Sequence, residues 1–324
     1  MFKKIRVGVL RGGPSSEYDV SLKTGDTVIH NLPDIYYPVD IFISRDGVWH
    51  MHGVEKSPTQ ILSSLDVVFN ALHGAYGEDG KVQSILDHCG VPYTGSRSMP
   101  SAFAMNKDLT KKSLLPHGIK MAFHRLFKKG EVENLDHHEL FRMIPNPAVV
   151  KPVSAGSSVG VSIVRSFEDL ESALSSAFDH GDTVIVEEYI PGIEATCGVI
   201  DDFRGERHYT LLPVEIVPDT QHDFFTYQAK YGGGSRELCP SVSFPEQVTK
   251  IIQDYARKAH AGLGLRHYSR SDFIVHPKRG VFFLEANTLP GLTSESLLPK
   301  SLHAVGATLP QFLDHVITLA RTGR

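Results

Sequence analysis

Cysteine is scarce in this sequence, which has only Cys89, Cys197 and Cys239 among its 324 residues and no C-x-x-C pair. An odd, widely spaced set argues against a disulfide framework and predicts reduced thiols in a cytoplasmic protein. Positive charge is not in excess either, because 33 lysines and arginines face 37 acidic residues, for a net charge of -4. This balance excludes a general nucleic-acid-binding surface, although one local pocket can still be basic.

Long apolar runs are also missing. No stretch approaches the roughly 18 apolar residues that suggest a membrane helix, so we expect no membrane span. The start, MFKKIRVGVLRGG, holds only a strand-length apolar stretch, which is too short for a signal peptide. The 17 histidines are scattered, and the pair His137–His138 in EVENLDHHEL predicts a solvated helix face and not a metal site.

Strand and helix signals alternate through the first hundred residues. The runs KIRVGVL and LDVVFNALHG have the pattern of buried strands that end at glycine-rich turns, and KVQSILDHCG reads as a helix closed by glycine. This repetition is typical of a parallel sheet covered on both faces, and so of an α/β fold. Ligands of such sheets bind beyond the carboxyl ends of strands, where RGGPSSEYDVS and HGAYGEDG fall.

The pattern changes after residue 97. A helix around Met105 to Leu115 leads into four predicted strands, GIKMAFHRLF, AVVKPV, VGVSIV and DTVIVEEYI. The last two are separated by a helix that starts with a capping box of Ser166 and Asp169. We therefore predict a small α+β unit over residues 98–188.

A long amphipathic helix is predicted over Phe244–Gly262, within the remaining part of the chain. Ser243 and Glu246 form its expected capping box. Its apolar face is made of Val248, Ile251, Ile252, Tyr255 and Ala259.

Four polar side chains meet in the predicted hairpin SRSDFIVHPKRGVFFLEAN. Arg270 and Asp272 are two apart on one strand, and Glu285 and Asn287 are two apart on the next, so each pair faces one side of the sheet. The short turn at Pro277–Gly280 favours strand pairing that brings Asp272 near Glu285. Three oxygen ligands suit Mg²⁺, which completes its shell with water and phosphate, whereas two carboxylates without a cation would repel each other. The alternative is a surface network of arginine and carboxylates.

A loop of small residues follows the predicted strand AVVKPV. Lys151 emerges from this strand, and the backbone N–H groups of Gly156–Gly160 can approach a phosphate closely. The loop is not a Walker A motif, because the lysine precedes the glycines. The alternative is a hydrolase motif, G-x-S-x-G, with Ser158 as nucleophile, which requires a helix after the loop. The β-branched run VGVSIV predicts a strand there instead.

A Pro-Gly turn lies within VIVEEYIPGIEATCGVI, with Glu187, Glu188 and Glu194 around it. Alone, the pattern predicts a surface hairpin. Because the turn separates two predicted units, it is also suited to be a hinge over a planar ligand.

Together these elements resemble the ATP-grasp superfamily and, within it, the D-alanine–D-alanine ligase family, over nearly the whole chain. Similar to the family's signatures are GGPSSEYDVS, HGAYGEDG, the phosphate loop KPVSAGSSVG, the mobile loop FFTYQAKY and the metal strand RSDF…LEANTLPGLTSESLLP. Single pieces are weak signals, but five in this order and spacing are specific.

The resemblance implies an ATP-grasp fold with an N-terminal parallel-sheet (preATP-grasp) domain, 1–97, and two α+β lobes, 98–188 and 189–324, that sandwich ATP. The implied reaction joins two D-alanines through an acyl phosphate, for peptidoglycan precursor synthesis. ATP is the co-substrate, with two Mg²⁺ or Mn²⁺ ions. The resemblance also implies a cytoplasmic homodimer.

Roles at the nucleotide follow from the family pattern. The resemblance places Lys107 and Lys151 at the phosphates, Glu187, Tyr189 and Ile190 at the adenine, and Glu194 at the ribose. The implied metal ligands are Asp272, Glu285 and Asn287, with Glu285 bridging the two ions.

Roles at the amino acids follow in the same way. Glu17 and His73 match positions around the first D-alanine, and Ser157 matches a serine linked to Glu17. The resemblance gives Arg270 and the Gly291 backbone to the tetrahedral intermediate, Ser296 and Leu297 to the second D-alanine, and Lys230 and Tyr231 to the closing loop.

The mobile-loop segment departs from the family in two respects. Thr226 stands where aspartate is common, and Gly232–Gly234 add entropy that loop closure must overcome. Tyr231 favours an amine acceptor, because relatives that use D-lactate usually have phenylalanine there. The alternatives are a ligase with D-serine or D-lactate as acceptor, and a silent ATP-binding relative, which would be expected only if a metal ligand or Arg270 were missing.

Overall fold

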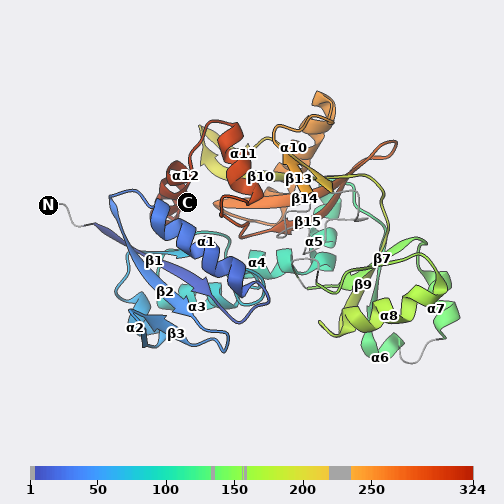
Figure 1. The fold of residues 1–324 in the computed structure, drawn as a ribbon, viewed down its shortest axis with the longest axis horizontal. Helices are drawn as coiled ribbons and strands as arrows, with labels where there is room; N and C mark the ends of the chain where they lie inside the picture. The colour runs from blue at the N-terminus through green and yellow to red at the C-terminus, as the bar shows by residue number, and fades with distance from the viewer. Residues whose placement is uncertain (1–3, 133–135, 155, 157–158, 219–234, 324) are drawn as a thin grey trace.

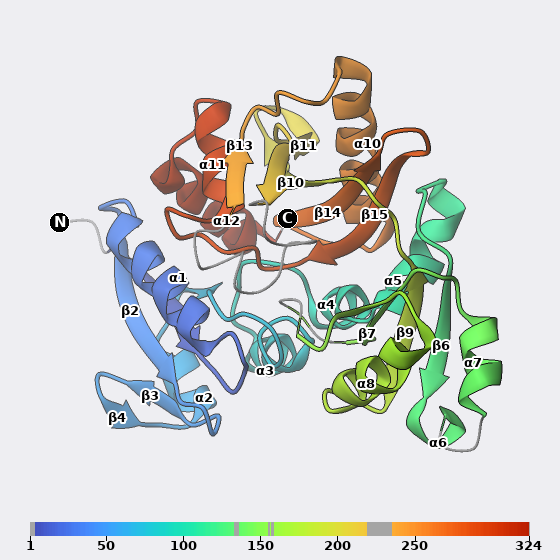
Figure 2. The same cartoon turned by 45° about the vertical axis from the view of Figure 1, so that its right-hand side comes forward.

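Three β-sheets organise the computed structural model, which describes residues 4–132, 136–154, 156, 159–218 and 235–323. Figure 2 separates them, with the blue N-terminal unit at the left, a green unit at the lower right and a yellow-to-red sheet above both. None of the helices in these ranges is both long and apolar enough to cross a membrane. The α/β fold class predicted from the sequence is confirmed.

The N-terminal sheet has the strand order β4-β3-β2-β1-β5, in which β1 pairs in parallel with both β2 and β5. The parallel sheet expected from the strand–glycine–helix repetition is therefore confirmed, with β3 and β4 as an antiparallel edge. Its elements are β1 (Ile5–Gly12), α1 (Tyr18–Asn31), β2 (Tyr36–Ile43), β3 (Trp49–Met51), β4 (Val54–Glu55), α2 (Pro58–Leu62), β5 (Val67–Asn70) and α3 (Lys81–Cys89).

The side chains of this sheet alternate between its two faces, and each face packs in its own hydrophobic core. Val7 and Val9 of β1 pack in one core, while Leu10 packs with Leu86 of α3 in the other. The two glycine-rich segments follow β1 and β5, which are neighbouring parallel strands, so they lie together at the carboxyl edge of the sheet.

The second sheet is antiparallel, with the order β6-β9-β7-β8. The predicted capping box of Ser166 and Asp169 is present at the start of its covering helix. The elements of this region are α4 (Ser98–Met105), α5 (Lys107–Leu114), the 3₁₀ turn η1 (Leu115–His117), β6 (His124–Lys128), α6 (Lys129–Val132), α7 (His137–Met143), β7 (Ala148–Pro152), β8 (Ser162–Val164), α8 (Phe167–Phe178) and β9 (Thr183–Glu188).

Two boundaries in this region differ from the sequence prediction. The helix expected from Met105 begins instead at Lys107, because the Asn106 side chain accepts the backbone N–H groups that open α5. The strand expected over GIKMAFHRLF is shorter, because Met121 bridges to Phe283 of the third sheet.

The third sheet has the order β13-β12-β10-β14-β15, and β11 pairs with β10. Its central strands are long and antiparallel, and α10 packs on one face (Figure 1). The elements are β10 (Ile193–Phe203), β11 (Glu206–Thr210), β12 (Val214–Pro218), β13 (Ser235–Leu238), α10 (Glu246–Gly262), β14 (Tyr268–His276), β15 (Gly280–Asn287), α11 (Leu297–Ala304) and α12 (Leu309–Thr322).

The apolar face of α10 is as predicted, since Ile252 and Ala259 are buried and the other three residues pack against the same core. The predicted capping box is wrong. The helix begins at Glu246 with Pro245 as its N-cap, and no side chain caps it. Ser243 has a different role, because its backbone N–H donates to the Glu215 carboxylate at 3.0 Å.

The C-terminal helix α12 completes the core of the N-terminal sheet. Phe312, Val316 and Ile317 of α12 share a core with Val7 and Val9 of β1. The division of the chain into domains after residues 97 and 188 stays a prediction. The packing of α12 shows that the last helix of the chain contributes to the core of the first sheet.

We predict that Phe312→Ala lowers the free energy of unfolding by about 3–5 kcal/mol, because it empties a fully buried site. The ring also loses its edge contact with Tyr268, whose centroid is 5.2 Å away. Urea denaturation measures the change. Leu115→Ala, at a side chain that is 70% exposed, is the control and should change little. Equal effects of the two variants would contradict the shared core.

Candidate active site

A cavity of about 930 Å³ lies where the three sheets meet. Side chains from all three line it, and they include every sequence-predicted site residue that the structure describes. These are Glu17, His73, Lys107, Lys151, Glu187, Tyr189, Ile190, Glu194, Arg270, Asp272, Glu285, Asn287, Gly291, Ser296 and Leu297. Ser157, Lys230 and Tyr231 lie outside the described residues, as do Ser158 and Thr226.

The β14–β15 hairpin pairs as the sequence predicts. Asp272 is opposite Glu285, and Arg270 is opposite Asn287. The Arg270 guanidinium donates two hydrogen bonds to the Asp272 carboxylate, both at 2.9 Å, and the Asn287 amide donates a third at 3.0 Å. Arg270 and Asp272 are each only 16% exposed and line the cavity, so the surface-network alternative does not describe them. The register shifts directly after Asp272, and bulges of this kind re-aim side chains beside sites.

A buried cluster of charges forms the opposite wall. The Glu187 carboxylate contacts Lys111 Nζ and Lys151 Nζ, both at 2.7 Å. Burial alone would raise the pKa of Glu187, but the two lysines outweigh it and lower the pKa to about 2. Glu187 is therefore ionised at neutral pH.

Helix α5 supplies two lysines to this wall. Lys107 and Lys111 are one turn apart, so both point to the same side. Lys107 Nζ lies 3.5 Å from the Glu285 carboxylate, which connects the lysine cluster to the hairpin. Burial lowers the pKa of both lysines below its ordinary value. Lys111 was not predicted from the sequence. The pattern that could have identified it is the spacing of Lys107 and Lys111, which places two lysines on one helix face, where they would repel each other without an anion between them.

The N-terminal unit contributes Glu17, His73 and Glu78 to the lining of the cavity. Glu17 and His73 are buried, and His73 Nε2 lies 2.8 Å from Thr24 Oγ1. Burial lowers the pKa of His73, so the imidazole is neutral at pH 7. Glu78 accepts the N–H groups of Gly74 at 2.8 Å and Leu289 at 3.0 Å.

Glu78 was also missed, although it stands in the motif HGAYGEDG. Burial and the nearby Glu17 raise its pKa to about 7. Its hydrogen bond to Leu289 joins the N-terminal unit to the segment after β15.

That segment is tightly turned around Gly291. A Cβ atom at Gly291 would lie 2.8 Å from Ser296 Oγ, so a larger residue does not fit without movement. Ser296 Oγ accepts the backbone N–H of Thr293 at 3.1 Å and precedes α11, which begins at Leu297.

Two alternatives are decided by the topology. The segment after the glycine loop forms strand β8, which pairs with β7, and the next helix starts only at Phe167. The hydrolase elbow at Ser158 therefore lacks its helix. Strands β9 and β10 lie in different sheets, so VIVEEYIPGIEATCGVI is a connection between sheets and not a surface hairpin.

The three sheets around one cavity place this chain in the class of ATP-grasp proteins. Two family models match the chain, described as D-ala D-ala ligase N-terminus over residues 52–96 and D-ala D-ala ligase C-terminus over residues 114–318. The chain belongs to the D-alanine–D-alanine ligase family.

Individual relatives agree with this assignment. The chain is 38% identical to a D-alanine–D-alanine ligase from Syntrophobacter fumaroxidans, with 98% of each chain covered. It is 41% identical to one from Chelativorans sp., with 97% of each covered. Among solved structures, the Bacillus anthracis D-alanine–D-alanine ligase has a TM-score of 0.81 and 34% identity, covering 98% of this chain and 99% of that one. The VanG D-Ala:D-Ser ligase from Enterococcus faecalis has a TM-score of 0.84 and 30% identity, covering 98% and 100%.

We predict that Glu187→Gln lowers the free energy of unfolding by a few kcal/mol at pH 7, because two buried lysines lose their counter-charge. The folded-state pKa of Glu187, about 2, lies below its ordinary 4.5. The stabilisation is therefore fully present above pH 4.5 and is lost as the pH falls towards 2. Urea denaturation should show the gap between wild type and variant narrowing from pH 5 to pH 3.

The matched control for this experiment is Glu171→Gln, at an exposed position of α8, which should leave stability nearly unchanged at each pH. A gap that stays constant between pH 5 and pH 3 would contradict the ionised Glu187.

Proposed function

We propose that this chain is an ATP-dependent ligase that joins two D-alanines into D-alanyl-D-alanine for peptidoglycan precursor synthesis. The single observation that carries the proposal is the cavity, where buried lysines face a carboxylate–amide hairpin in a chain of this family. A carboxylate of the first D-alanine attacks the γ-phosphoryl group and releases ADP. The amine of the second D-alanine then attacks the acyl phosphate, and phosphate leaves. Positioning and charge neutralisation are the main tasks of the protein.

ATP is proposed to lie between the second and third sheets. Lys107 and Lys151 bind the phosphates, supported by their burial and by the anionic partners that already hold them in place. The segment of Glu187, Tyr189 and Ile190 contacts the adenine, and Glu194 contacts the ribose, because these residues line the cavity along the β9–β10 connection.

Two Mg²⁺ or Mn²⁺ ions are proposed at Asp272, Glu285 and Asn287. The donor set fits, because carboxylate and amide oxygens are hard ligands and all three residues line the cavity from neighbouring strands. The bound ions would neutralise phosphate charge. Lys107 and Lys151 line the same cavity as the hairpin, and Lys107 Nζ lies 3.5 Å from the Glu285 carboxylate. Phosphate oxygens between these groups would therefore be surrounded by positive charge.

The amino acid sites are proposed nearer the N-terminal unit. Glu17 and His73 orient the first D-alanine, together with Ser157. An added Cβ at the neighbouring Gly156 would lie 3.1 Å from Glu17, so the phosphate loop passes close to this carboxylate. Arg270 and the Gly291 N–H would stabilise the tetrahedral intermediate, and Ser296 and Leu297 would contact the second D-alanine.

The segment that contains Lys230 and Tyr231 is proposed to close over the site. Acyl phosphates hydrolyse readily, so the reaction requires that water be excluded. The proposed homodimer and the cytoplasmic location rest on the family resemblance.

A second candidate function is a ligase that uses D-serine or D-lactate as acceptor. The likeness to the VanG D-Ala:D-Ser ligase favours it, but the relatives that share 38% and 41% of their sequence with this chain are named D-alanine–D-alanine ligases.

Release of ADP from ATP, measured with D-alanine, L-alanine, D-serine and D-lactate, tests the proposal directly. We expect turnover with D-alanine alone, and no turnover with L-alanine alone. For the second candidate, D-serine or D-lactate added to D-alanine would give the mixed product in excess of D-alanyl-D-alanine, as mass spectrometry would detect. No D-alanine-dependent release of ADP would refute both candidates.

We predict that Glu285→Gln lowers the rate of ADP release by about three powers of ten, because it removes one charge from the proposed metal site. Glu285 is 25% exposed, so the folded structure should persist, as circular dichroism and the Tm can verify. Glu246→Gln, at an exposed ion pair on α10, is the matched control and should keep the wild-type rate. Normal turnover of Glu285→Gln would sink the metal assignment.

A further inference from the structure

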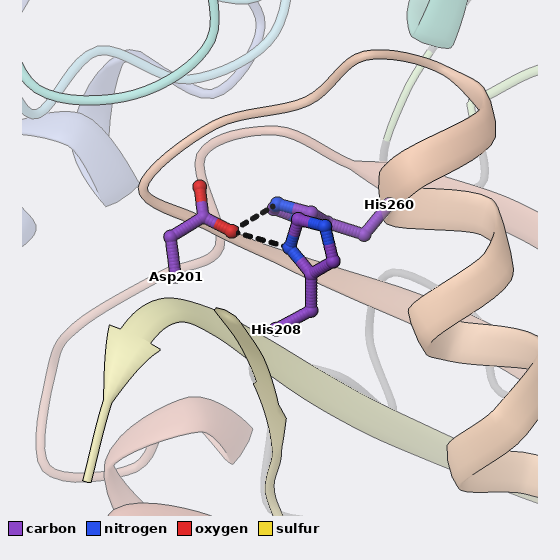
Figure 3. Close-up of side chains that lie close together, drawn as sticks. All are labelled: Asp201, His208 and His260. Carbon is purple, nitrogen blue, oxygen red and sulfur yellow. Dashed lines mark hydrogen bonds and ion pairs between the residues drawn. The ribbon is translucent and has the colours of Figure 1, made fainter. Parts of the chain in front are cut away.

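A second cluster of metal-ligating side chains lies outside the cavity. It consists of Asp201 on β10, His208 on β11 and His260 on α10 (Figure 3). None of the three lines the cavity. His208 Nδ1 lies 2.8 Å and His260 Nε2 lies 3.0 Å from the same oxygen, Asp201 Oδ1. All three ligand atoms lie within 4.8 Å of one another.

The backbone fixes this cluster on rigid elements. Asp201 and His208 are directly opposite each other in the β10–β11 pair, so their side chains share one sheet face. His260 is fully buried on α10, the helix that packs on this sheet. Sites on strands and helices hold their ligands more accurately than sites on loops.

Further contacts orient the ligands. Ser269 Oγ lies 2.7 Å from His260 Nδ1, the ring nitrogen that faces away from Asp201. The backbone N–H of His267 donates to the other Asp201 oxygen, Oδ2, at 2.6 Å. Such outer hydrogen bonds are typical of metal sites, because they select the imidazole tautomer and hold the carboxylate.

We propose that Asp201, His208 and His260 bind a divalent transition-metal ion, with Zn²⁺ as the best match. Two imidazoles and a carboxylate form a mixed nitrogen and oxygen set that suits Zn²⁺, whereas Mg²⁺ prefers oxygen ligands alone. A tetrahedral ion with bonds of about 2.0 Å separates its ligand atoms by about 3.3 Å. The two nitrogen–oxygen distances need to grow by only a few tenths of an ångström.

To bind a metal ion, His208 Nδ1 and His260 Nε2 must each present a lone pair, and a change of tautomer in each imidazole ring provides it. Without a metal, His260 Nε2–H donates to Asp201 while Nδ1 accepts from the Ser269 hydroxyl. With a metal, the proton moves to Nδ1, which then donates to Ser269 Oγ, and Nε2 is free to coordinate. His208 shifts its proton from Nδ1 to Nε2 in the same way.

The site is separate from the proposed magnesium site. Thr196 of β10 donates to Asp272 at 2.7 Å, and Asp201 lies five residues further along the strand, or roughly 16 Å at the usual rise. His208 and Asp201 are 20% and 16% exposed, which leaves one side of the cluster open for an ion to enter and for water as a fourth ligand. The bound ion would cross-link the β10–β11 hairpin to α10 and so stabilise the third sheet.

Binding can be tested on the full-length, untagged protein after removal of metals with a chelator. Zn²⁺ is titrated calorimetrically with excess Mg²⁺ present, so that oxygen-ligand sites are already filled. Co²⁺ is titrated in parallel, because four-coordinate Co²⁺ absorbs visible light much more strongly than six-coordinate Co²⁺. We expect one saturable Zn²⁺ site, a four-coordinate Co²⁺ spectrum and a higher Tm with Zn²⁺.

His208→Gln should weaken Zn²⁺ binding by about 100-fold or more and abolish the four-coordinate spectrum. This variant keeps a side chain that can hydrogen bond to Asp201, so the fold should survive where a change at the buried His260 could disrupt it. His50→Gln is the matched control, because His50 is also a partly buried strand histidine. Absence of saturable Zn²⁺ binding, a six-coordinate Co²⁺ spectrum, or equal losses in the two variants would each overturn the proposal.

Discussion

The buried Glu187 carboxylate between Lys111 and Lys151 is the interaction on which the cavity depends. Two ammonium groups cannot stay charged away from water unless an anion compensates them. Glu187 provides that compensation and so connects α5, β7 and β9, whose residues form the positively charged wall. The same strand, β9, then leads into β10 and the third sheet. One ion-paired carboxylate therefore balances the two lysines of this wall, on the strand that leads into the third sheet.

The opposite wall has the complementary charge. Asp272 and Glu285 stand side by side on β14 and β15, and Arg270 and Lys107 approach them from two directions. Cations and carboxylates that line one cavity suit the negatively charged phosphates of ATP together with the divalent ions proposed above. For a reaction that proceeds through an acyl phosphate, this arrangement lets the protein contribute mainly through fixed charge and position.

Much of the fold could be predicted because the relevant patterns are local. The parallel strands, the β14–β15 hairpin and the apolar face of α10 follow from the alternation of side chains along a few residues. The errors occurred where a distant partner decides the outcome. Glu215 holds the backbone before α10 and replaces the expected cap, and Met121 pairs with the third sheet instead of extending β6.

The sequence by itself determined the family, the strand before the glycine loop and the positions of the hairpin carboxylates, because these depend on short spacings and on the order of motifs. Only the tertiary structure decided which residues meet across long separations. It placed Lys111 against Glu187, Phe312 under the first sheet, and His260 beside Asp201 and His208. Side-chain periodicity shows which face a residue occupies, but the partner on that face depends on how sheets and helices pack, which no local pattern encodes.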